Sequence, residues 1–155
     1  MGRVLFYHLT RSPLEATLAT LLGKSLAAGF RVDVRGTDPA RLEHLDAALW
    51  LKPEDGFLPH GVAGGPHDDR QPVLLTHETT ARSGTTCLMS IDGATIAPEE
   101  PAVMERVCIL FDGNNEADLT AARAQWRTLT SAGAVAEYWS QDEGPWRKKM
   151  STDSS

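Results

Sequence analysis

Hydrophobic and polar positions along the chain alternate between two periods, one typical of helices and one typical of strands. Helical spacing of apolar residues predicts helices from Pro13 to Gly29, from Pro39 to a point before Pro53, and over 116–131, with a short helix or turn at 98–104. Short β-rich runs predict strands at residues 4–8, 31–35, 73–76, 86–91, 106–111 and 134–139. Because strands and helices alternate, we expect an α/β fold with a mainly parallel sheet.

The residues around the first helix indicate where it begins and ends. Ser12 is suited to cap its N-terminus, Pro13 to occupy its first position, and Glu15 to complete a capping box. Gly29 is expected directly after its C-terminal end. Residues 52–72, after the second helix, are rich in proline and glycine and are predicted to form a long surface loop.

The chain is expected to form one domain over residues 1–149, followed by a disordered tail at 150–155. Its 155 residues suffice for a sizeable core, and its apolar runs are far too short for a membrane span. The N-terminus shows no secretory signal, and Cys87 and Cys108 lie inside apolar runs, as in a reduced protein. We therefore expect a cytoplasmic protein with no membrane partner.

The net charge of -6 disfavours broad electrostatic binding to a phosphate backbone. Contact with nucleic acid would require a local basic patch or an intermediary protein. Trp139, Trp146 and the basic residues 147–149 have the right types for direct binding to single-stranded DNA. The overall acidity argues against that hypothesis, which stays open as an alternative.

The nucleotide-binding motifs typical of α/β proteins are missing from the sequence. No glycine-rich G-x-G-x-x-G follows the first strand, and no P-loop is found. Residues 112–115 (Asp-Gly-Asn-Asn) follow the fifth predicted strand at the carboxyl edge of the sheet, where ligands often bind. We favour a tight turn that caps the next helix, and keep as an alternative a nucleotide-using enzyme with a site near Asp112 and Asn114.

The sequence indicates neither a metal site nor a group of catalytic side chains. His60, His67, Asp68 and Asp69 lie in the proline- and glycine-rich loop without the spacing of a zinc site, so a solvated polar loop is favoured. No Ser-His-Asp order or nucleophile elbow is present. We therefore expect no metal, no cofactor and no catalytic residue.

A recognition site is indicated more clearly, in the helix predicted over 116–131. Arg123 and Arg127 are four residues apart and share one helix face, with Trp126 beside them. A planar guanidinium can hold a carboxylate while the neighbouring indole accepts an apolar side chain. Such a site suits a peptide with an acidic and aromatic end. The competing interpretation is that Trp126 belongs to the core and both arginines are solvated.

Several short motifs occur together at a characteristic spacing. Asp46–Trp50 reads D-x-A-L-W, and Phe57–His60 follows as F-L-P-H. The other pieces are Ile109–Asp112, Ala121–Trp126 and Tyr138–Trp139. On these motifs the chain resembles the chi subunit of bacterial DNA polymerase III holoenzyme, over nearly all of residues 1–149. The resemblance implies a Rossmann-like three-layer sandwich, with helices on both faces of the sheet and no bound nucleotide.

The resemblance also implies a function. Chi-like proteins are not catalysts; they belong to the clamp-loader part of the replicative polymerase. They bind the acidic C-terminal tail of single-stranded DNA-binding protein, and in some bacteria they bind a small partner called psi. The chain is thus expected to be a non-catalytic replication subunit whose contact with nucleic acid is indirect.

The same resemblance implies roles for individual residues. Arg123 corresponds to the basic residue that grips the terminal carboxylate of the tail, Trp126 to an aromatic residue beside that pocket, and Arg127 to a neighbouring basic position. Trp50 and Phe57 match aromatic positions near the psi-binding surface. The sequence departs from the family in three places: Leu119 replaces a lysine, Asp112 replaces an apolar residue, and the tail at 144–149 is longer and more basic.

Overall fold

A computed structural model of the chain describes residues 3–10, 13–51, 60–63, 71–141 and 146–152. Its helices are α1 (Leu14–Ala27), α2 (Pro39–Leu51), α3 (Glu100–Val103) and α4 (Glu116–Ser131). Its strands are β1 (Arg3–Leu9), β2 (Val32–Arg35), β3 (Gly61–Val62), β4 (Val73–Thr76), β5 (Cys87–Ser90), β6 (Arg106–Asp112), β7 (Ala136–Ser140) and β8 (Arg147–Ser151).

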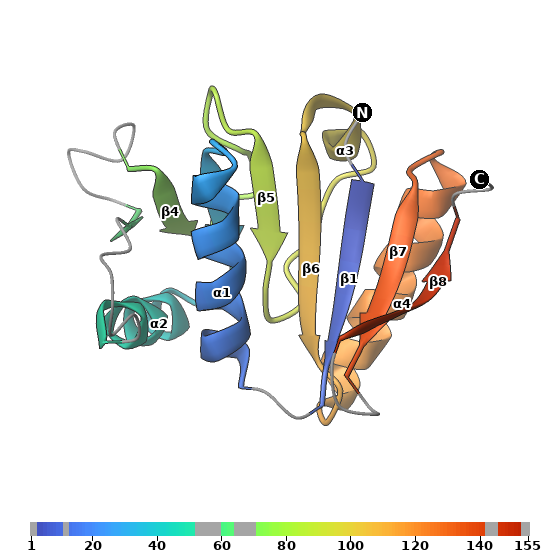
Figure 1. The fold of residues 1–155 in the computed structure, drawn as a ribbon, viewed down its shortest axis with the longest axis horizontal. Helices are drawn as coiled ribbons and strands as arrows, with labels where there is room; N and C mark the ends of the chain where they lie inside the picture. The colour runs from blue at the N-terminus through green and yellow to red at the C-terminus, as the bar shows by residue number, and fades with distance from the viewer. Residues whose placement is uncertain (1–2, 11–12, 52–59, 64–70, 142–145, 153–155) are drawn as a thin grey trace.

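The described strands form one sheet in the order β3-β4-β2-β5-β6-β1-β7-β8 (Figure 1). Every neighbouring pair is parallel except β7 and β8, which are antiparallel. This arrangement confirms the predicted α/β fold with a mainly parallel sheet. It also places β1, the first strand in the chain, between β6 and β7.

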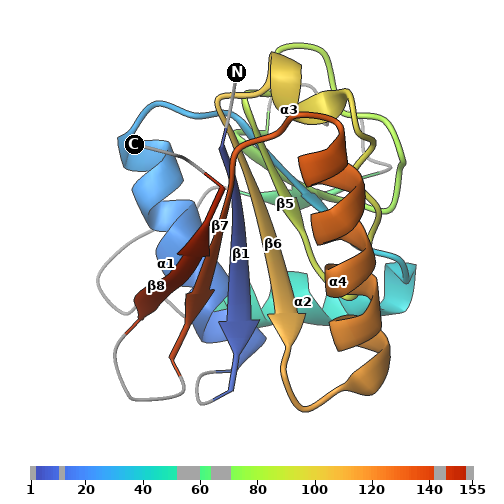
Figure 2. The ribbon, with the colours of Figure 1, turned by 90° about the vertical axis from the view of Figure 1, so that its right-hand side faces the viewer.

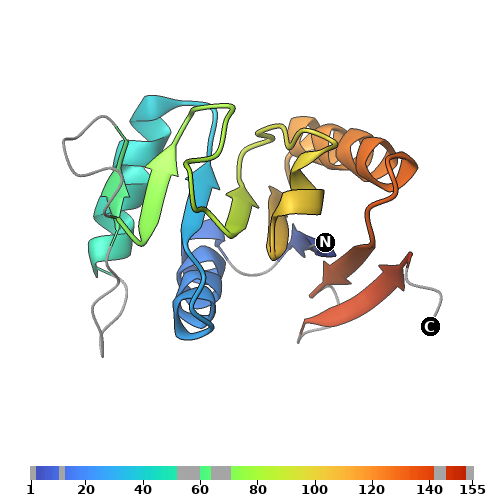
Figure 3. The same ribbon diagram turned by 90° about the horizontal axis from the view of Figure 1, so that it is seen from above.

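Helices cover both faces of the sheet and bury a core on each. Leu18 of α1 and Leu45 of α2 pack in one core with Val34 of β2. On the other face, Leu129 of α4 packs with Phe6 of β1. Figure 2 and the view from above in Figure 3 both show α1 and α4 on opposite sides of the sheet. The three-layer sandwich is therefore confirmed.

The start of α1 differs from the prediction, whereas its end agrees. Pro13 is the N-cap residue rather than the first helical residue, and its own side chain makes no capping hydrogen bond. The Glu15 carboxylate accepts a hydrogen bond from Arg41 of α2, at 3.1 Å. Ser12 lies outside the described residues. Gly29 follows the helix with a φ of 84°, a left-handed conformation that favours glycine.

Two strands were not predicted. The first, β3, lies inside the segment predicted as a loop. The second, β8, contains Met150 and Ser151, which were wrongly assigned to a disordered tail. The next residue, Thr152, donates from its backbone to Ala136 O at 2.9 Å and accepts from Ala136 N through its hydroxyl at 2.8 Å. An edge strand with an Arg-Lys-Lys sequence has no apolar alternation, so its formation depends on backbone pairing with β7.

Two charged residues of β2 are buried on the face opposite its valines. Asp33 is 1% exposed and Arg35 is 2% exposed. Asp33 accepts hydrogen bonds from Arg82 Nε at 2.6 Å and from the Thr85 hydroxyl at 3.0 Å. Arg35 forms an ion pair with Glu100 at 2.8 Å, which ties α3 to the sheet. Buried ion pairs therefore fasten the connections after β4 and β5 onto this face.

The surroundings of Glu100 lower the pKa of its carboxyl group. Burial alone would raise the pKa of Glu100, but hydrogen bonds from Arg35 and from the backbone of Ala97 outweigh it and lower the pKa. A carboxyl with a lowered pKa in the folded protein contributes stability above its unfolded pKa of about 4.3 and loses that contribution as the pH falls. The Arg35–Glu100 pair is thus intact at neutral pH and weakens in acid.

We expect the variant Arg82→Met to lower the free energy of unfolding by about 3–5 kcal/mol, because it leaves the Asp33 carboxylate buried without its ion-pair partner. Urea denaturation measures this change. Lys24→Met, at an exposed position of α1, serves as the control and should change stability by no more than about 0.5 kcal/mol. A loss below about 1 kcal/mol for Arg82→Met would show that the pair does not fasten the loop.

Candidate functional site

The residues predicted to bind a peptide line one groove between α4 and the sheet. We call it the α4 groove; its volume is about 350 Å³. Arg123, Trp126 and Arg127 all lie in its wall, as the spacing on the helix predicted. Among the described residues, its lining is Phe6, His8, Phe111, Leu119, Ala122, Arg123, Trp126, Arg127, Tyr138 and Met150. The structure thus brings residues of β1, β6, β7 and β8 to the predicted helix face.

Aromatic rings form the floor of the α4 groove. Trp126 packs edge-to-face on Phe6, with ring centroids 5.2 Å apart, and on Tyr138 at 6.3 Å. Trp126 is half-buried and belongs to the edge of the core, while Arg123 and Arg127 are exposed at the rim. The interpretation of Trp126 as a core residue is therefore correct in part, because the same ring also lines the groove. An apolar floor lies beneath two guanidinium groups.

His8 is a groove residue that no sequence motif pointed to. Its Nδ1 is hydrogen-bonded to the Tyr138 hydroxyl at 2.5 Å, and its ring stacks on Phe111 with centroids 5.0 Å apart. A Cβ atom at position 113 would collide with the His8 ring, so Gly113 permits this ring position. Glycine at position 113 therefore allows the His8 ring to approach the backbone closely, in addition to its predicted place in a tight turn.

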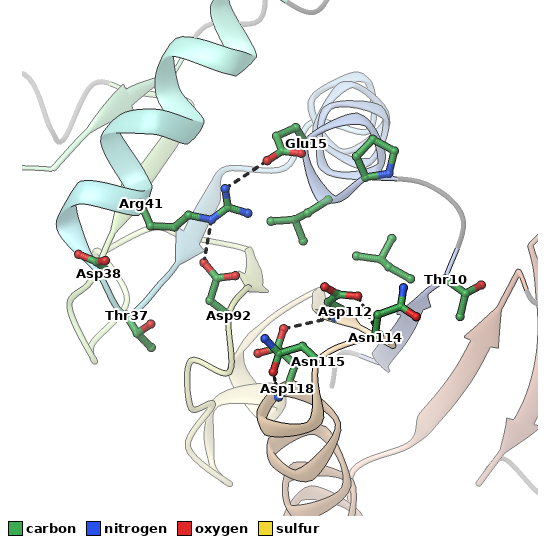
Figure 4. A pocket seen from close by; sticks show the side chains of 13 residues that line it. Thr10, Glu15, Thr37, Asp38, Arg41, Asp92, Asp112, Asn114, Asn115 and Asp118 are labelled. Carbon is green, nitrogen blue, oxygen red and sulfur yellow. Dashed lines mark hydrogen bonds and ion pairs between the residues drawn. The ribbon is translucent and has the colours of Figure 1, made fainter.

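A larger cavity, of about 850 Å³, lies at the carboxyl edge of the sheet (Figure 4). It opens where β1 continues to α1 on one face and β6 continues to α4 on the other, so we call it the switch-point cavity. Among the described residues, its charged lining consists of Glu15, Asp38, Asp92, Asp112 and Asp118, with Arg41 as the cation. This is the place where a nucleotide would bind if the alternative function were correct.

The charges of the switch-point cavity are unsuited to a phosphate. Arg41 is held between Glu15 at 3.1 Å and Asp92 at 3.3 Å, and is therefore already neutralised. The pKa of Asp118 is raised by burial and, after that, by the negative charges of Asp92 and Asp112. A further anion would add to this repulsion.

The turn after β6 uses its polar groups internally. Asp112 Oδ1 accepts from the backbone of Asn114 at 2.9 Å. Asn115 is the N-cap of α4, and its side chain accepts from the backbone of Asp118 at 3.0 Å. The predicted tight turn that caps the next helix is confirmed. Asp112, one of the departures from the family, faces this cavity and does not line the α4 groove.

The histidine and aspartate group that was considered as a metal site is only partly described. His60 is buried, with its Nε2 atom 3.0 Å from Asp46 Oδ1, so the expectation of a solvated side chain is wrong for this residue. Residues 67–69 lie outside the described ranges. Within those ranges, no group of three or more His, Cys, Asp or Glu side chains could hold a metal ion.

The remaining aromatic candidates lie elsewhere. Trp139 and Trp146 are half-buried against the α1 face, where Trp146 packs edge-to-face on Tyr7 at 5.3 Å. They therefore lie on the opposite side of the sheet from the α4 groove. Trp50 falls at the end of α2 and Phe57 is outside the described residues, so their assignment to a psi-type interface stays a prediction.

Comparison with known proteins identifies the family. The model of the family described as "DNA polymerase III chi subunit, HolC" matches residues 1–137. The chain belongs to this family. "Probable DNA polymerase III subunit chi" of Rickettsia prowazekii (strain Madrid E) is 26% identical over 117 residues, which are 72% of this chain and 71% of the relative. The resemblance to chi is thereby confirmed. Among the described helices of this chi-family chain, none has the length and apolar character needed to span a bilayer.

We expect ATP and NAD to leave the melting temperature unchanged, because the acidic lining of the switch-point cavity repels phosphate. A thermal-shift measurement tests this, since a ligand at 100 times its Kd would stabilise the protein by about 2.7 kcal/mol. A rise of several degrees that Asp112→Asn abolishes would instead support a nucleotide-using enzyme.

Proposed function

We propose that the chain is a non-catalytic accessory subunit of the DNA polymerase III holoenzyme that binds the acidic C-terminal tail of single-stranded DNA-binding protein. In this role it links that protein to the clamp-loader complex during DNA replication. The family membership supports the polymerase III part of the proposal. Contact with nucleic acid would then be indirect, and the location cytoplasmic.

The observation that carries the peptide-binding part is the pairing of two guanidinium groups with an apolar floor in one groove. Arg123 and Arg127 lie on the α4 wall, above Phe6 and Tyr138. A guanidinium presents a planar fork of donors that matches a carboxylate. The terminal carboxylate of the tail would bind to Arg123, and an apolar or aromatic side chain beside it would pack on the floor.

Leu119 changes the balance of this site. The side chain is half-buried in the groove and packs against the core that includes Ala122. It adds apolar surface where the resemblance led us to expect a lysine. Affinity for the tail would therefore depend more on hydrophobic contact and on Arg123 and Arg127, and less on a third charge from α4.

A second interface completes the proposal. The end of α2 and the residues after it, with Trp50 and Phe57, would bind psi or another clamp-loader subunit. The support for this interface is the resemblance alone, together with the position of Trp50 near the end of α2.

We expect Arg123→Ala to weaken binding of a tail peptide by about 1.5–3 kcal/mol, the range for a hydrogen bond to a charged group. Isothermal titration calorimetry measures the loss. Lys24→Ala removes the same charge from α1, on the opposite face, and should leave the affinity unchanged. Binding by the wild type should also weaken as the salt concentration rises, because the arginines that would pair with the peptide are exposed to solvent. An unchanged affinity for Arg123→Ala would overturn this assignment.

A further inference from the structure

Strand β8 forms a wall of the α4 groove and lies beyond the residues that match the family. The family match ends at residue 137, within β7, whereas β8 spans Arg147–Ser151. Met150 lines the groove and is 55% exposed, one of the most exposed large apolar side chains in the described part of the chain. Figure 1 shows β8 at the edge of the sheet beside β7. The groove therefore contains a contribution from outside the matched region.

The register of the sheet shows which β8 residues face the groove. Met150 is opposite Tyr138, and Arg147 is opposite Ser140, which in turn pairs with His8 of β1. Residues directly opposite each other on neighbouring strands share a face of the sheet. Tyr138 and His8 line the groove, so Met150 and Arg147 lie on the groove face.

Lys148 lies on the other face. It is opposite Trp139, whose ring packs against the core beneath α1. The two neighbouring cations of β8, Arg147 and Lys148, are therefore separated by the sheet. This separation supplies a matched pair of positions with the same charge, the same strand and opposite faces.

A β-bulge produces this arrangement. In a regular strand, residues 147 and 150 would point to opposite faces, because successive side chains alternate. The register shifts between Tyr138 and Trp139, whose partners are Met150 and Lys148, so Lys149 is the extra residue. The bulge thus brings one apolar and one basic side chain of β8 to the same side. Neighbouring strands are about 4.8 Å apart, so Arg147 lies roughly 10 Å from His8 along the sheet.

We propose that β8 is the second wall of the peptide site: Met150 covers the apolar end of the bound tail, and Arg147 pairs with a carboxylate of its acidic stretch. This inference rests on the proposed function. Charge complementarity supports this occupant, because Arg123 and Arg127 line the groove on α4 and the register puts Arg147 of β8 on the same face of the sheet, where an acidic stretch leaving the groove would meet it. Arg147 supplies positive charge from β8, where α4 has the uncharged Leu119.

The test compares three single variants by calorimetry with the tail peptide. Arg147→Gln should weaken binding about two- to fivefold, the effect of one exposed ion pair. Met150→Gln keeps the length of the side chain but removes apolar contact, and should weaken binding about three- to tenfold. Lys148→Gln removes the same charge as Arg147→Gln from the opposite face and should leave the Kd within about 1.5-fold of wild type. All three side chains are exposed, so the melting temperatures of the three variants should match that of the wild type.

A second peptide makes the assignment of Arg147 specific. When the acidic residues upstream of the tail's end are replaced by their amides, Arg147→Gln should no longer change the affinity. The terminal carboxylate is still present, so Arg123→Ala should still weaken binding. This double-mutant cycle isolates the pairing between Arg147 and the acidic stretch.

The outcomes separate the two proposals. If the wild type does not bind the tail peptide, both are overturned. If it binds, and Arg123→Ala weakens binding while Arg147→Gln and Met150→Gln have no effect, the β8 wall alone is overturned. Equal losses of affinity for Arg147→Gln and Lys148→Gln would also overturn it. Equal losses would mean that the peptide is attracted by the positive charge of β8 in general and does not contact Arg147 on the groove face.

Discussion

The contact between Trp126 and Phe6 is the constraint on which the groove depends. Smaller residues of α4, such as Ala122 and Leu129, are buried completely against the sheet. The indole of Trp126 is half-buried: it packs edge-to-face on the Phe6 ring and also lines the groove. Its ring also packs edge-to-face on Tyr138, so one side chain joins α4 to β1 and β7 and lines the groove between them. Arg123 and Arg127 lie within one turn of Trp126, so the helix that this contact packs onto the sheet also carries both guanidinium groups to the groove.

On the sheet face that carries α4, the region over β2 is covered by loops that buried ion pairs hold in place. There, Asp33 and Arg35 are buried and paired with Arg82 and Glu100 from distant connections. Such pairs gain little net stability over an apolar contact, but they are costly to break, and they require one specific loop position. The result is a rigid scaffold: loops fastened by ion pairs at β2, and a helix fastened by aromatic contacts at β1. The groove forms on the second kind of surface, where apolar area is available for a ligand.

The sequence predicted what local periodicity encodes and missed what the order of strands decides. The spacing of Arg123, Trp126 and Arg127 was sufficient to place them on one helix face. Nothing in the local pattern showed that β1 lies between β6 and β7, and that order is what brings His8 and Tyr138 to the same groove. The β8 strand was missed because its basic residues have no apolar alternation. Likewise, the alternation around Asp33 correctly predicted a strand, but its long-range partner Arg82 is not encoded locally.

The proposed binding of an acidic peptide by a chain with a net charge of -6 would rely on the separation of its charges in space. Acidic residues gather in the switch-point cavity, whereas Arg123 and Arg127 line the α4 groove and Arg147 of β8 lies on the same face of the sheet. Exposed charges are screened over about 8 Å at physiological ionic strength, so a ligand responds mainly to its immediate neighbours. The net charge then governs weak attraction to long polyanions such as DNA, which span the whole surface. A short tail inside one groove would experience the local cations instead, and in the proposed function an acidic protein would thereby distinguish the acidic peptide from the nucleic acid.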